Sequence, residues 1–186
     1  RFHVPWKFRV TRGGVPAEVL AAAENADMTI LGRSGRSMTS RRRVGSTVRT
    51  VISKGRGMTL IIQQGMRFQP PVQVLFTGSS LSEKALALAL DLGRKKEIPV
   101  VVLVAGGPEE QAGLQERARE LIGSRGGEAS LHILPRALDL SQIDQAVRLH
   151  GSGPLFLPCE EPQLHGEELQ ALVDSVQNSI LLVRSR

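Results

Sequence analysis

The sequence predicts an α/β protein with a doubly wound, mostly parallel sheet. Three observations support this fold class: short apolar runs alternate with segments of helical periodicity, glycine-rich turns follow several of the runs, and one order of elements occurs twice. Strict alternation of strand and helix is typical of parallel sheets, because right-handed crossovers place helices on both faces. We expect one complete five-stranded domain preceded by a partial one.

The first part of the chain reads strand, helix, strand, helix, strand. Its apolar runs predict strands, and its stripes at helical spacing predict helices. Proline at position 16 suits the first turn of the first helix. The expected elements are a strand at 7–11, a helix at 16–26, a strand at 28–31, a helix beginning near Ser46 and a strand at 58–62.

The second part begins after a proline-rich stretch. We predict a partial domain at 1–65, a linker at 66–71 and a second domain at 72–186, because the two prolines in the linker can continue neither helix nor strand. The second domain is expected to have strands at 72–76, 98–105, 130–134, 154–157 and 179–183, and helices at 82–92, 109–123, 140–149 and 167–177. Its last three strands repeat the order of the first part.

A glycine motif follows the apolar run at 28–31. It reads Gly32-Arg33-Ser34-Gly35, nine residues, then Gly45-Ser46-Thr47. The first-turn amides of the helix that begins near Ser46 have no partner within the helix and favour an anion. Glycines let the main chain approach a ligand, and the two hydroxyls can add donors. The motif therefore predicts a phosphate site, and the alternative is an ordinary turn followed by an ordinary helix start.

Positive charge is concentrated around the motif. No acidic residue occurs between Asp27 and Glu83, although the whole chain has 24 Lys and Arg against 18 Asp and Glu. The cations of this interval are Arg33, Arg36, Arg41, Arg42, Arg43, Arg49, Lys54, Arg56 and Arg67. Such a patch can serve a small polyphosphate, nucleic acid or an acidic membrane surface. Trp6, five Phe and no Tyr leave little for base stacking, so nucleic acid is the weaker candidate.

The motif resembles the nucleotide-binding motif of the universal stress protein family, and the elements around it are similar to that family as well. The resemblance implies that Gly32, Gly35, Gly45, Ser46 and Thr47 line the triphosphate and ribose of ATP. AMP or ADP, and Mg²⁺ with the phosphates, are implied as alternatives and companions. We add Arg33, Arg36 and Arg41–Arg43 as candidates that offset phosphate charge.

The resemblance also bears on the organisation of the chain. The first part lacks the opening strand, helix and strand of the family, so we interpret the chain as the C-terminal portion of a tandem universal stress protein. Strands 7–11 and 28–31 would then flank a gap with unpaired edges, which upstream sequence or another chain would fill. Partners implied are an adenine nucleotide and a second domain, within the chain or in a homodimer.

The second domain departs from the motif. After its fourth strand it carries Glu160 and Glu161 in place of paired glycines, and carboxylates repel phosphate. Thr77 stands where the family commonly has an acidic residue. We therefore expect a domain that binds no nucleotide and packs its last strand or helices against the first.

We interpret the chain as a nucleotide-binding regulatory protein of the stress response, and three other functions stay open. Slow ATP hydrolysis needs a carboxylate near the phosphates, which the acid-free interval does not supply. The chain could instead be the cytosolic regulatory part of a membrane transporter, or bind nucleic acid through its arginines. No catalytic residue is assigned.

Cysteine and histidine usage gives no further site. Cys159 is the single cysteine, and the four histidines have no metal-ligand spacing. No apolar segment approaches the roughly 20 residues of a membrane span, and no signal peptide opens the sequence. A cytoplasmic location is expected.

Overall fold

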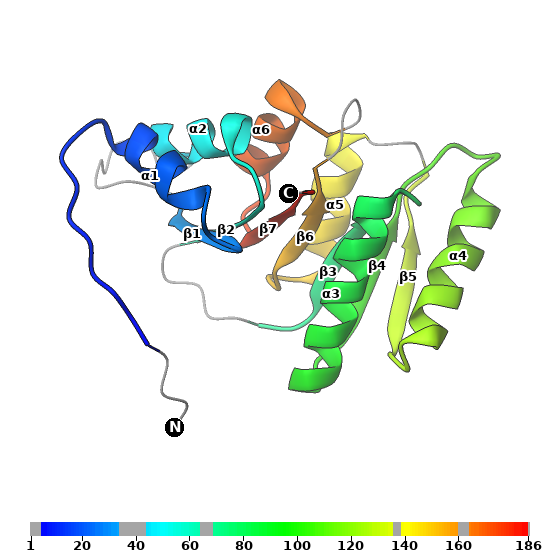
Figure 1. The fold of residues 1–186 in the computed structure, drawn as a ribbon. Coiled ribbons are helices and arrows are strands. Elements are labelled where there is room, and N and C mark those ends of the chain that lie inside the picture. The colour runs from blue at the N-terminus through cyan, green and yellow to red at the C-terminus, as the bar shows by residue number, and fades with distance from the viewer. Residues whose placement is uncertain (1–4, 34–43, 64–68, 136–138, 160–163, 186) are drawn as a thin grey trace.

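The computed structural model describes residues 5–33, 44–63, 69–135, 139–159 and 164–185. Helices and strands alternate along these ranges (Figure 1). The elements are α1 (Val15–Ala23), β1 (Met28–Gly32), α2 (Ser46–Lys54), β2 (Met58–Ile62), β3 (Val72–Phe76), α3 (Ser80–Lys96), β4 (Val100–Val104), α4 (Gln111–Ser124), β5 (Ala129–Ile133), α5 (Leu140–His150), β6 (Leu155–Pro158), α6 (Gly166–Ser175) and β7 (Ile180–Val183).

Within the described ranges seven strands form one sheet, in the order β1-β2-β7-β6-β3-β4-β5. The five strands of the second part follow the doubly wound order, with β3 in the middle, and pair in parallel. The α/β fold class is therefore confirmed. The predicted five strands form only part of a larger sheet, because β2 pairs with β7.

The β2–β7 pair is antiparallel and joins the two parts of the chain. Its register places Leu60 opposite Leu181. The first part of the chain thus runs its strands against those of the second, and its helix α2 packs against α6. The expectation that the last strand or the helices of the second part pack against the first is confirmed.

Two arginines reinforce this junction by capping helices of the opposite part. Arg184 follows β7 and donates to the carbonyls of Val51, Ile52 and Gly55 at the C-terminal end of α2. Arg33 follows β1 and makes the corresponding contacts at the end of α6. Since the last carbonyls of a helix have no partner within it and carry negative partial charge, a guanidinium satisfies both needs.

The core consists of two apolar layers, one on each side of the sheet. Helices α2, α5 and α6 contribute Val48, Ile143 and Leu172 to one layer, and α3 and α4 contribute Leu86 and Ala118 to the other. All five residues of β3 and of β4 are buried. Continuous apolar runs of this kind occur where a strand is covered on both sides, as the sequence predicted for β4.

The cover is incomplete at β1 and β2. Helix α1 packs against α2, and both helices lie on the same face of β1 and β2 (Figure 1). On the other side Met28, Ile30 and Ile62 are 38, 58 and 38% exposed. Among the described residues β1 pairs only with β2, so its outer edge and one apolar face remain open.

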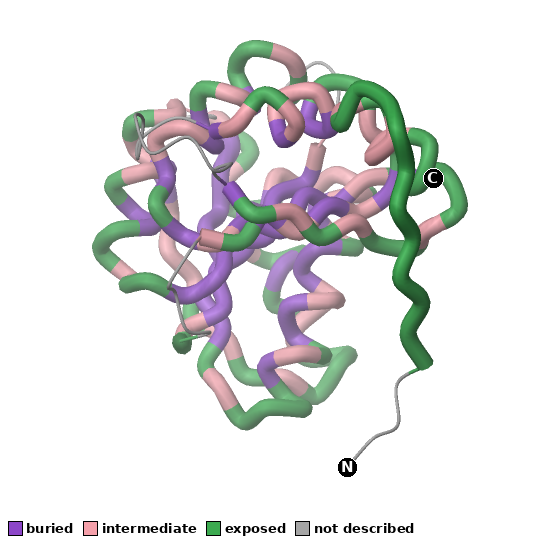
Figure 2. Tube along the Cα trace, turned by 90° about the vertical axis from the view of Figure 1, so that its left-hand side faces the viewer, coloured by how far each residue is buried: buried purple, intermediate pink, exposed green. Residues whose placement is uncertain are grey.

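The predicted strand at 7–11 is wrong. Residues 5–12 form neither helix nor strand and run past the body of the molecule (Figures 1 and 2). Phe8 and Val10, the apolar residues of the predicted strand, are 83 and 76% exposed, and the neighbouring Trp6 is 82% exposed. Alternation shows only that a segment fits a sheet, whereas a strand also needs a neighbour that pairs its amides and carbonyls.

Several helix boundaries also differ from the prediction. Helix α1 ends at Ala23, three residues early, and α3 extends from Ser80 to Lys96. The Ser79 hydroxyl accepts from the backbone N–H of Ser82 and starts α3 before its apolar stripe begins. Local capping, which the apolar pattern does not register, therefore sets the start of α3.

Substituting Arg184 tests the junction. We expect Arg184→Ala to lower the free energy of unfolding by about 2 kcal/mol, because two α2 carbonyls and that of its C-cap Gly55 lose a charged donor. Urea unfolding followed by circular dichroism measures this. Arg94→Ala removes only a surface ion pair with Asp91 and should change stability by less than about 0.5 kcal/mol. Equal midpoints for the two variants would contradict the capping role.

Candidate functional site

The glycine motif begins at the carboxyl end of β1 and ends at the start of α2. Gly32 is the last residue of β1, and Gly45 is the N-cap of α2. The backbone N–H of Gly45 donates to the Arg33 carbonyl at 2.9 Å, and the Arg33 N–H donates to the Ile62 carbonyl of β2. The structure therefore brings the first and last glycines of the motif together. Ser34, Gly35, Arg36 and Arg41–Arg43 lie outside the described residues.

The N-terminus of α2 is the anion-attracting element of the site. Its N-cap is a glycine, no described side chain accepts a hydrogen bond from its first-turn amides, and no acidic residue occupies that turn. Ser46 is exposed and Thr47 half-buried, so both hydroxyls lie near the surface. Gly45 has φ −63° and ψ 155°, which any residue can adopt. A free helix start of this kind is suited to a phosphate or carboxylate.

Arg33 has a structural task that the sequence did not indicate. Its side chain is only 4% exposed and donates to the carbonyls of Val173, Asp174 and Val176 at 2.5–2.9 Å. Burial lowers the pKa of the guanidinium, and the nearby Asp174 carboxylate opposes that change. An arginine keeps its charge under such conditions, so the motif begins with a buried cation fixed on α6.

Asp174 is the residue of this region that sequence reasoning missed. Its carboxylate accepts from the Val44 backbone N–H at 2.9 Å and pairs with Arg49 at 3.0 Å. Arg49 also donates to the Val44 carbonyl. Asp174 lies 130 positions from Val44, and no local pattern signals a contact of that range.

The equivalent end of the second part is filled by a side chain. Gly78 and Gly106 follow β3 and β4, where a doubly wound sheet commonly binds its ligand. A Cβ at either glycine would overlap Leu114 of α4, so this leucine occupies the space between them. Thr77 Oγ1 lies 3.1 Å from the Ser79 hydroxyl, which also serves as N-cap of α3. Glu160 and Glu161 lie outside the described residues.

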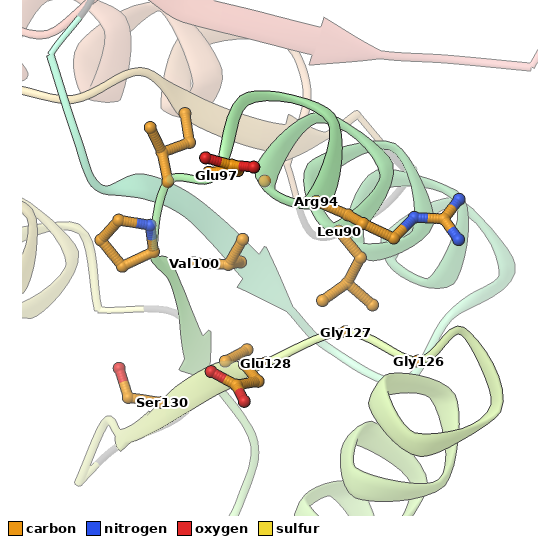
Figure 3. A pocket seen from close by; sticks show the side chains of 12 residues that line it. Leu90, Arg94, Glu97, Val100, Gly126, Gly127, Glu128 and Ser130 are labelled. Atoms are coloured by element: carbon orange, nitrogen blue, oxygen red, sulfur yellow. The ribbon is translucent and has the colours of Figure 1, made fainter.

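A separate cleft of about 770 Å³ lies between the end of α3 and the start of β5 (Figure 3). Gly126, Gly127 and Ser130 line it together with the carboxylates of Glu97 and Glu128. Arg94 at its rim is paired with Asp91. The cleft is five strands away from β1 in the sheet and includes none of the residues of the glycine motif.

Comparisons with known proteins confirm the resemblance to universal stress proteins. Residues 4–63 match the universal stress protein family. A search of the curated proteins found no match. The match covers about a third of the chain and includes the glycine motif.

Solved structures extend the likeness in fold to nearly the whole chain. A universal stress protein from Archaeoglobus fulgidus superposes with TM-score 0.74 and 16% identity over 91% of this chain and 66% of its own. A functionally unknown protein from Pseudomonas aeruginosa superposes with TM-score 0.69 and 12% identity, over 94% of this chain and 69% of its own. A second universal stress protein from Archaeoglobus fulgidus superposes with TM-score 0.51 and 18% identity, over 63% of this chain and 95% of its own. The chain spans about two thirds of the length of the first two proteins.

Within the described ranges no cluster of three or more His, Cys, Asp or Glu residues could hold a metal ion. Over the same ranges no helix combines the length and the apolar character needed to cross a bilayer. Cys159 follows β6, is partly buried and packs against the core.

His132 on β5 and His150 at the end of α5 form an edge-to-face pair, with ring centroids 4.9 Å apart. The Nε2 atom of His150 is buried and has no hydrogen-bond partner among the residues that the structure describes. Burial, and secondarily the charge of His132, lower the pKa of His150 below its ordinary 6.5. The unfolded chain therefore binds a proton at His150 more readily than the folded chain does.

This pair predicts a loss of stability on acidification. As the pH falls below about 6.5 the unfolded state gains protons first, so the free energy of unfolding should decrease. Urea midpoints at pH 7.5, 6.5 and 5.5 should fall less in His150→Gln than in the wild type. His165→Gln, at an exposed position, is the matched control and should keep the wild-type slope. An unchanged slope in His150→Gln would contradict the assignment.

Proposed function

We propose that the chain binds ATP, or a related adenine nucleotide, at the N-terminus of α2 and acts as a regulatory protein of the stress response. The observation that carries this proposal is the hydrogen bond from the Gly45 N–H to the Arg33 carbonyl, which joins the two described ends of the glycine motif beside a helix start without a side-chain cap. The match of residues 4–63 to the universal stress protein family supports it. The phosphates would lie against the α2 amides and the hydroxyls of Ser46 and Thr47, with Gly35 completing the motif.

The electrostatics of the site favour the same ligand class. Arg33 and Arg49 carry two positive charges beside the helix start, and Asp174 neutralises only one of them. The α2 dipole adds positive potential at its N-terminus. ATP, with or without Mg²⁺, would neutralise this excess of positive charge, and AMP and ADP, which carry less negative charge, would neutralise it less fully.

We propose further that binding acts through association, either between the two parts of the chain or with a second copy. Support comes from Arg33. Its backbone belongs to the motif, and its guanidinium donates to carbonyls at the end of α6 in the other part of the chain. Nucleotide that orders the motif would also act on the β2–β7 junction. A nucleotide state that stabilises this junction would be the regulatory output.

A thermal-shift experiment with ATP, with AMP and without ligand tests nucleotide binding. A ligand at 100 times its dissociation constant stabilises a protein by about 2.7 kcal/mol, so millimolar ATP should raise the melting temperature of the wild type. Gly45→Asp should abolish the response, since its carboxylate would cap the amides and repel phosphate. The φ and ψ of Gly45 are open to any residue, so aspartate adds no backbone strain there, and circular dichroism of the variant checks that it is folded.

Gly14→Asp is the matched control. Gly14 is the N-cap of α1, also without a side-chain cap, and its environment leaves open space for a Cβ. This variant should respond to ATP as the wild type does. A wild type that ignores ATP, or a Gly45→Asp variant with an undiminished shift, would refute the proposed site. Binding of DNA that weakens steeply with salt and is indifferent to ATP would favour the nucleic-acid alternative.

A further inference from the structure

Asp174 contacts the segment that leads into the proposed nucleotide site, although it belongs to the other part of the chain. One carboxylate oxygen accepts from the Val44 N–H at 2.9 Å, and the other pairs with Arg49 at 3.0 Å. Val44 directly precedes Gly45, the N-cap of α2. The side chain of Asp174 thus fixes the backbone one residue before the amides that would receive phosphate.

The other end of the motif is held at the same place on α6. The guanidinium of Arg33 donates to the carbonyl of Asp174 and to those of its neighbours Val173 and Val176. The carbonyl of Arg33 in turn accepts from Gly45. Both ends of the motif are therefore attached to the last turn of α6, one through a side chain of the motif and one through a side chain of the helix.

The Val44 contact satisfies a group that would otherwise be unpaired. Val44 is 4% exposed, and its N–H points to Asp174, outside α2. A buried N–H without an acceptor costs about 1–3 kcal/mol, so loss of the carboxylate would drive Val44 toward other conformations. A ligand would then have to order this segment on binding, which reduces its affinity.

We propose that Asp174 is a positioning residue for the nucleotide site, so that α6 of the second part sets the affinity of the first part for phosphate. This inference rests on the proposed function. The carboxylate does not cancel the positive potential, because Arg33 and Arg49 both lie beside it. The end of α6 would thus influence the site through the backbone of Val44, without contacting the nucleotide.

Calorimetric titration of ATP into four proteins tests the proposal, each well below its melting temperature. Asp174→Ala should weaken ATP binding about tenfold, within the usual range of coupling between sites. Asp174→Asn keeps an oxygen that accepts from the Val44 N–H and should stay within about threefold of the wild type. Arg184→Ala loosens the same junction at the opposite end of α2 and should lower the melting temperature without changing the dissociation constant.

The outcomes separate this inference from the proposed function. A wild type without ATP affinity overturns both. A wild type that binds ATP, with Asp174→Ala binding equally well, overturns only the positioning role. The role is also refuted if Arg184→Ala weakens binding as much as Asp174→Ala, because general loosening would then explain both. Equal weakening of ATP binding in Asp174→Asn and Asp174→Ala would also refute the role, because loss of the negative charge, and not loss of the Val44 contact, would then explain the weaker binding.

Discussion

The antiparallel pairing of β2 with β7 is the contact on which the rest of the structure depends. It merges the two strands of the first part and the five-stranded doubly wound sheet of the second into a single seven-stranded sheet. It also places α2 against α6, and each of these helices receives an arginine from the opposite part at its last turn. Without this pair, β1 and β2 would be an isolated two-stranded ribbon, which is marginal in water.

Much of the fold could be predicted from apolar pattern alone. Runs such as 100–104, buried along their whole length, identify central strands without ambiguity, and every expected helix is present. The strand at 7–11 failed because alternation carries no information about a neighbour. The β2–β7 pair was foreseen only as a general contact, since its register depends on residues some 120 positions apart.

The candidate site was predictable in part for the same reason. Glycine spacing and the acid-free interval identify the motif, because both are local properties of the chain. The orientation of Arg33 and the arrival of Asp174 are products of tertiary packing. Sequence reasoning counted Arg33 among the cations available to phosphate, whereas in the folded chain its guanidinium donates to three carbonyls at the C-terminal end of α6.

The position of β7 inside the sheet, between β2 and β6, has a consequence for synthesis of the chain. A ribosome releases β1 and β2 long before β7, the strand that must lie between β2 and β6. Until then the apolar edge of β2 is exposed in the nascent polypeptide, and slow closure of so long a loop prolongs that exposure. We expect chaperone dependence during translation to be highest in the interval between emergence of residue 62 and emergence of residue 183.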